Sequence, residues 1–81
     1  MTTREFTDQV LNDIDREVDR AVTKHGHYNS PHEAYGVLLE EVDEFFDEVK
    51  KQKADVDRGA MRTELTQIAA VCVRAIYDLC Q

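Results

Sequence analysis

The chain has 81 residues, of which 42% are apolar, and it carries a formal net charge of −7. This apolar content excludes a disordered chain, and the length suits one small domain. The negative charge argues against a surface for nucleic acids or anionic membranes, because phosphate groups are usually bound by basic faces. A domain this small has a limited core, so self-association is a common source of added stability.

No stretch approaches the roughly 20 apolar residues of a membrane span, and the N-terminus lacks the apolar run of a signal peptide. We therefore expect a cytoplasmic protein with one domain over residues 1–81 and no membrane partner. Cys72 and Cys80 lie too far apart on a helix to form a disulfide. Both are expected to be reduced residues of the core.

The first predicted helix runs from about Glu5 to Lys24. Its apolar residues recur at spacings of three and four with charges between them, which is typical of an amphipathic helix. They are Phe6, Val10, Ile14, Val18, Ala21 and Val22. Gly26 is expected to cap the C-terminus, because glycine adopts a left-handed conformation readily.

The second predicted helix begins after Ser30 and runs to about Lys53. Ser30 is a favourable N-cap, Pro31 suits the first helical position, and Glu33 completes a capping box. One apolar stripe follows, made of Tyr35, Leu38, Leu39, Val42, Phe45, Phe46 and Val49.

The third predicted helix runs from about Ala60 to Leu79, after a connection over residues 54–59. Residues 68–73 are apolar nearly all round, and such a helix is usually buried on more than one side. Three helices alone do not readily achieve this, so we infer a partner subunit. The pattern predicts an all-α fold: an antiparallel bundle of three main helices, completed by oligomerisation.

Four acidic residues crowd a five-residue window of the second helix: Glu40, Glu41, Asp43 and Glu44. At about 100° per residue, Glu41 and Glu44 lie to one side of the apolar stripe of the second helix. Glu64 lies to one side of the apolar stripe of the third helix, which centres near Cys72, in the same sense of rotation about the helix axis. In an antiparallel pair these side chains can converge on one point. Grouped carboxylates suit Mg²⁺ or Mn²⁺. The alternative is a solvated face without a ligand, which Asp43 fits easily.

These residues resemble a known family signature. Glu40-Glu41-x-x-Glu44, followed after 19 residues by Glu64-x-x-Gln67, looks like the E-E-x-x-E…E-x-x-D pattern of MazG-like all-α nucleoside triphosphate pyrophosphohydrolases. The flanking segments 32–39 and 65–71 resemble the core helices of that family. The similarity covers about half of the chain.

The resemblance implies Mg²⁺-dependent hydrolysis of a nucleoside or deoxynucleoside triphosphate to monophosphate and pyrophosphate by a homodimer or homotetramer. It assigns catalytic metal binding to Glu41, Glu44 and Glu64, with Glu40 as a ligand or as an acid behind the ligands. Gln67 departs from the pattern, because its amide offers the metal a neutral oxygen and no charge. A relative that binds nucleotide or metal without turnover, and a non-enzymatic helical interaction module, remain open alternatives.

Weaker candidates for substrate contact lie outside the acidic blocks. His25 and Asn29 belong to a polar segment that can also be a simple surface loop. Lys53 and Arg62 flank the connection between the second and third helices, where a lysine also suits the helix dipole. Arg74 lies on the same side of its helix as Gln67, two turns further on, and is the better phosphate candidate.

Overall fold

The computed structural model describes residues 1–81 and contains three main helices and no strand. Helix α1 spans Thr3–His25, α2 spans Pro31–Val49 and α3 spans Arg58–Leu79. A short 3-10 helix, η1, spans Lys53–Asp55 between α2 and α3. The predicted all-α class is confirmed. None of the helices combines the length and hydropathy that a membrane span requires.

Local capping interactions begin and end α1 and begin α2. Gly26 follows α1 with φ +76°, and its N–H donates to the Val22 carbonyl at 2.8 Å. The Ser30 hydroxyl accepts from the Glu33 N–H at 3.1 Å, as predicted. The reciprocal half of the capping box differs, because the Glu33 carboxylate accepts from the main chain and side chain of Asn29 at 3.4 and 3.3 Å instead of from Ser30.

The connection between α2 and α3 is longer than the sequence indicated. Helix α2 ends at Val49, four residues before the predicted end, and Gln52 already has an extended backbone. Helix α3 begins two residues early because the Asp57 side chain accepts from the Ala60 N–H at 3.0 Å and caps it. One acidic residue of the connection between α2 and α3, Asp57, is therefore the N-cap of α3.

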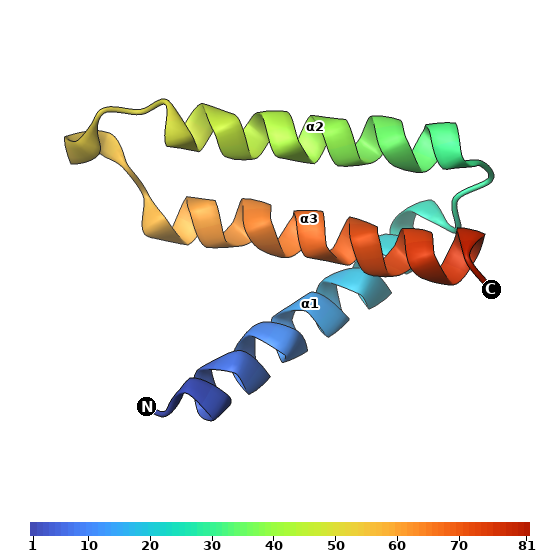
Figure 1. The fold of residues 1–81 in the computed structure, drawn as a ribbon, viewed down its shortest axis with the longest axis horizontal. Helices are drawn as coiled ribbons and strands as arrows, with labels where there is room; N and C mark the ends of the chain where they lie inside the picture. The colour runs from blue at the N-terminus through green and yellow to red at the C-terminus, as the bar shows by residue number, and fades with distance from the viewer.

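Helix α3 packs against both other helices, whereas α1 and α2 make no close backbone approach. In Figure 1, α2 and α3 lie side by side along most of their length, and α1 runs obliquely to them with the N-terminus far from α2. The three helices consequently enclose little volume. The residues with less than a tenth of their surface exposed are Ala21, Tyr28, Ala34, Ala70, Val71 and Arg74.

The molecule exposes more surface than a compact monomer of its size. Its accessible surface is 6077 Å², whereas a compact 9.3 kDa monomer exposes about 5,000 Å². The radius of gyration is 13.9 Å, against about 12 Å for a compact domain of this length. Large apolar side chains account for part of the excess, among them Leu39 and Ile76. The expectation that Cys72 and Cys80 lie in the core is wrong, because both are exposed and unpaired.

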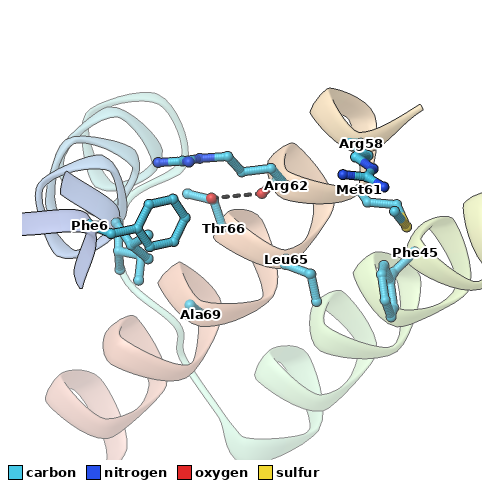
Figure 2. Close-up of a pocket in the computed structure, with 10 residues that line it drawn as sticks. Phe6, Phe45, Arg58, Met61, Arg62, Leu65, Thr66 and Ala69 are labelled. Atoms are coloured by element: carbon cyan, nitrogen blue, oxygen red, sulfur yellow. Dashed lines mark hydrogen bonds between the residues drawn. The ribbon is translucent and has the colours of Figure 1, made fainter. Parts of the chain in front are cut away.

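An apolar groove of about 520 Å³ lies across α3. Figure 2 shows Phe6 of α1 on one side of α3 and Phe45 of α2 on the other, with Leu65 and Ala69 between them. The Arg62 guanidinium stacks 5.3 Å from the Phe6 ring centroid and donates to Asp13 at 2.9 Å. Arg62 therefore joins the N-terminal half of α1 to α3.

Candidate metal centre and adjoining groove

Three carboxylates converge between α2 and α3. Glu41 and Glu44 lie on successive turns of α2, and Glu64 faces them from α3. One oxygen from each side chain can be chosen so that all three lie within 4.8 Å of one another. Glu41 and Glu64 are partly buried and Glu44 is exposed. The three side chains could hold a metal ion.

Burial and mutual repulsion disturb the ionisation of this group. Burial raises the pKa of Glu41 to about 7, with the charges of Glu44 and Glu64 adding to the effect. The pKa of Glu64 is also raised, first by burial and then by its hydrogen bond and charge interaction with Glu44. Burial, together with the neighbouring like charges, therefore makes the metal-free cluster hold protons that isolated carboxylates would release.

Gln67 occupies the fourth corner of the cluster, one turn beyond Glu64 on α3. With the amide oriented to satisfy its surroundings, its nitrogen donates to Glu41 Oε2 at 2.8 Å and to Glu64 Oε2 at 3.2 Å. The sequence suggested a carbonyl oxygen facing an ion. That contact stays a prediction; in this orientation the amide nitrogen bridges the carboxylates of Glu41 and Glu64.

Two further acids contribute to the cluster and were not identified from the sequence. The side chain of Glu48 is only 15% exposed, and its charge helps to raise the pKa of Glu64. One Glu48 oxygen binds Lys51 at 2.8 Å, and the other is buried without a partner. Its position seven residues after Glu41 was the available signal. Glu17 of α1 also raises the pKa of Glu41, which the sequence could not indicate without the packing of α1.

Glu40 lies outside this three-carboxylate group and is exposed. It lines a neighbouring groove of about 400 Å³ that also reaches Glu41. The other polar residues of this groove are His25, Tyr28, Glu33 and Arg74. The groove and the cluster thus share Glu41.

The weaker substrate candidates divide into two groups. His25 and Arg74 line the groove beside Glu41. Asn29 does not line the groove, although its side chain donates to Glu33, which does; Lys53 lies in η1, beyond the far end of α2. Arg62 already contacts α1, where it donates to Asp13 and lies over the Phe6 ring.

Comparison of the chain with protein-family models, curated proteins and solved structures gave no match. The resemblance to MazG-like enzymes accordingly depends on the two acidic blocks and their helical context. What the geometry contributes independently is the meeting of Glu41, Glu44 and Glu64 at one point.

Proposed function

We propose that the protein is a Mg²⁺- or Mn²⁺-dependent pyrophosphohydrolase that converts a nucleoside or deoxynucleoside triphosphate to the monophosphate and pyrophosphate. The observation that carries this proposal is the convergence of Glu41, Glu44 and Glu64 within 4.8 Å. Carboxylate oxygens are the ligands that these hard cations prefer. The same three residues are the ones that the family signature assigns to the metal.

The state of the cluster without metal favours a cation at this position. Three neighbouring carboxylates, with raised pKa values at Glu41 and Glu64, form a local excess of negative charge. The buried, unpartnered oxygen of Glu48 adds to it. A divalent cation would remove this repulsion, so its binding would be favoured by the arrangement of the side chains themselves.

In the proposed reaction, water attacks the α- or the β-phosphorus, and the bond from that phosphorus to the oxygen that joins these two phosphorus atoms breaks, which gives the monophosphate and pyrophosphate. A bound divalent ion would polarise the phosphoryl group and lower the pKa of the attacking water. Glu41, Glu44 and Glu64 would hold the ion, and the Gln67 amide would keep Glu41 and Glu64 in position through its two hydrogen bonds.

We also propose that the active form is a symmetric homodimer, in which each protomer contributes its antiparallel pair of helices α2 and α3 to the interface. On α2 the exposed apolar residues follow alternating steps of four and three: Tyr35, Leu39, Val42, Phe46 and Val49. On α3 a matching series is formed by Leu65, Ala69, Cys72 and Ile76. We call these two series the apolar seams. This spacing is that of helices that pack along a shared axis.

The two seams face the same way in the proposed arrangement. The side of α2 that meets α3 carries Ala34 and Leu38, and the facing side of α3 carries Val71 and Ala75. At about 100° per residue, both seams are displaced from these sides by roughly 80–110° in the same sense of rotation. Together they form one apolar face. The surface in excess of a compact monomer is about 1,000 Å², close to the roughly 800 Å² that each partner buries in a stable complex.

A second candidate function is metal or nucleotide binding without turnover. Gln67 favours it, because an amide at the fourth corner supplies no charge for a second ion and cannot act as a base. A helical interaction module without a ligand is the third candidate, and the exposed apolar seams favour it.

The test is pyrophosphate release from a panel of ribonucleoside and deoxyribonucleoside triphosphates with Mg²⁺ or Mn²⁺. We expect release by the wild type and a loss of at least about 100-fold in Glu41→Gln, which removes a ligand charge. Gln67→Asp restores the family pattern and should raise activity or metal affinity. Asp43→Asn is the matched control, because Asp43 is an exposed acid of α2 outside the cluster.

Each candidate gives a different result in this experiment. Release that survives Glu41→Gln would exclude the proposed site. A rise in Tm with Mg²⁺ but no release would favour the binding protein, and a Tm that is indifferent to divalent metal would favour the interaction module.

A further inference from the structure

The groove beside the metal centre contains two buried polar atoms with no hydrogen-bond partner. They are the Tyr28 hydroxyl and the Arg74 Nε. Tyr28 is 7% exposed and Arg74 is 6% exposed, and both residues line the groove. Buried polar atoms in folded proteins are almost always hydrogen-bonded, so two unpartnered groups lining one groove call for an explanation.

Arg74 is a buried cation without a carboxylate partner. Its Nη2 donates to the neutral carbonyl of Gly26 at 3.2 Å, and its Cζ lies 4.3 Å from the centroid of the Tyr28 ring. The stacking on Tyr28 fixes the plane of the guanidinium. A guanidinium remains charged at any physiological pH and can donate two hydrogen bonds at once to a carboxylate or phosphate group.

The remaining lining of the groove selects the kind of anion. His25 adds a second nitrogen donor, whereas Glu33, Glu40 and Glu41 repel a bare anion. An oxyanion that arrives together with a divalent cation meets less of this repulsion, because the cation would sit at the cluster that includes Glu41. The groove volume of about 400 Å³ lies within the range of small-molecule sites.

We propose that Tyr28 and Arg74 form a subsite for a phosphate group of a ligand whose metal-bound end lies at the cluster of Glu41, Glu44 and Glu64. Both atoms are closed to water in this structure, so the Tyr28 hydroxyl and the Arg74 Nε must turn toward the groove to donate to the phosphate oxygens. This subsite rests on the proposed function, since it assigns one end of a polyphosphate chain to the groove and the other to the metal centre. Binding at the subsite depends on divalent metal.

The test measures the binding of inorganic pyrophosphate by calorimetry, with and without Mg²⁺, to the wild type and to Tyr28→Phe. This substitution removes only the hydroxyl and keeps the ring beneath Arg74, whereas substitutions of the buried Arg74 itself can unfold the protein. With Mg²⁺ we expect the Kd of Tyr28→Phe to be raised about threefold to tenfold, the effect of one hydrogen bond. The ligand-free Tm should stay equal or rise, because an unsatisfied buried hydroxyl is lost.

Tyr77→Phe is the matched control, because Tyr77 is 62% exposed and lies outside both the groove and the apolar seams. It should bind pyrophosphate as the wild type does. Unchanged binding in Tyr28→Phe, no binding by the wild type with Mg²⁺, equal binding without metal, or a lowered ligand-free Tm in Tyr28→Phe would each overturn the subsite. So would a phosphate-free nucleoside whose binding is weakened by Tyr28→Phe while that of pyrophosphate is not.

The subsite and the hydrolase proposal fail separately. Hydrolysis of a nucleoside triphosphate together with unchanged pyrophosphate binding in Tyr28→Phe would leave the hydrolase proposal intact and exclude the subsite. Metal-dependent pyrophosphate binding that is weakened in Tyr28→Phe, without hydrolysis of any nucleotide, would establish the subsite and exclude the enzyme.

Discussion

Glu41 is the residue at which the cluster, the groove and α1 meet. It belongs to the candidate metal centre with Glu44 and Glu64 and lines the neighbouring groove. The charge of Glu17 on α1 also helps to raise its pKa. Burial is the largest cause of its raised pKa, and like charges are the next. The residue that best fits a metal ligand is therefore also the one that destabilises the metal-free fold most when it ionises.

The raised pKa of Glu41 predicts that stability falls with rising pH when no divalent metal is present. Its carboxyl titrates at 4.5 when unperturbed and at about 7 in the folded chain. Between these values the folded state holds a proton that the unfolded state has lost, so raising the pH favours unfolding. In EDTA we expect Tm to fall by roughly 5–10 °C between pH 5 and pH 7.5, measured by thermal unfolding followed by circular dichroism.

Excess Mg²⁺ should reduce this fall, because an ion at the cluster keeps Glu41 ionised in the folded state. Glu41→Gln should reduce it without metal, although not to zero, since the pKa of Glu64 is raised as well. Asp43→Asn should behave as the wild type. A Glu41→Gln profile that matches the wild type would show that this carboxyl does not carry the effect.

The sequence was sufficient to bring Glu41, Glu44 and Glu64 together, because helical periodicity fixes the directions of side chains on two adjacent helices. It was not sufficient for Glu48, whose burial depends on how closely α3 approaches the last turns of α2. Tyr28 lies in a segment without regular structure, where periodicity gives no direction. Its burial against Arg74 follows from tertiary packing alone.

At the scale of elements, Asp78 is one of the side chains of α3 that hold the segment between α1 and α2. The Asp78 carboxylate accepts from the Tyr28 N–H at 2.7 Å and lies 2.6 Å from His27 Nδ1. These bonds lower the pKa of Asp78, the Tyr28 N–H most strongly. The Asp78 side chain is 4% exposed. The contact therefore positions Tyr28 in the groove as well as fastening the turn.

Replacing Asp78 should weaken this attachment. We expect Asp78→Asn to lower Tm by about 4–8 °C at pH 7, the shift typical of one lost hydrogen bond in a domain of this size. A lowered carboxyl pKa stabilises the fold above its ordinary value of 3.8 and ceases to do so as the pH falls below it. The difference from the wild type should accordingly shrink below pH 3.8, as measured by thermal unfolding over a pH series.

Asp19→Asn is the matched control, because Asp19 is an exposed acid of α1 that takes part in no ion pair. It should leave Tm unchanged at both ends of the pH range. An Asp78→Asn protein that is as stable as the wild type at pH 7 would contradict the proposed role of this contact.

Local sequence signals predict some of the helix ends but not all of them, and they do not predict how the helices are arranged. Gly26 and Ser30 were predictable as caps because their effects are local. The end of α2 was not, since the sequence through Lys53 contains no glycine or proline that would stop a helix. The oblique course of α1 was not predictable either, because its apolar stripe fits a closed bundle and an open one equally well.

For the whole molecule, the shape and the surface composition favour association through the apolar seams. Without a partner, the series on α2 leaves five large apolar side chains in water: Tyr35, Leu39, Val42, Phe46 and Val49. The open course of α1 leaves the face of α2 and α3 that carries the seams uncovered. Covering this face would stabilise the assembly by about 25 cal/mol for each Å² of apolar surface buried. Burial of this kind is a main source of stability for small domains that associate.

A charge in the seam should therefore dissociate the protein, whereas the same change elsewhere should not. Leu39 is 44% exposed within the α2 seam, and Leu11 is 54% exposed on α1, outside both seams. By sedimentation equilibrium at micromolar concentration we expect the wild type and Leu11→Lys at twice the chain mass of 9.3 kDa. Leu39→Lys should shift toward the single-chain mass, because a lysine ammonium cannot be buried in an apolar contact without a partner. A wild type that stays at the single-chain mass would refute the dimer, and equal dissociation by Leu11→Lys would place the interface elsewhere.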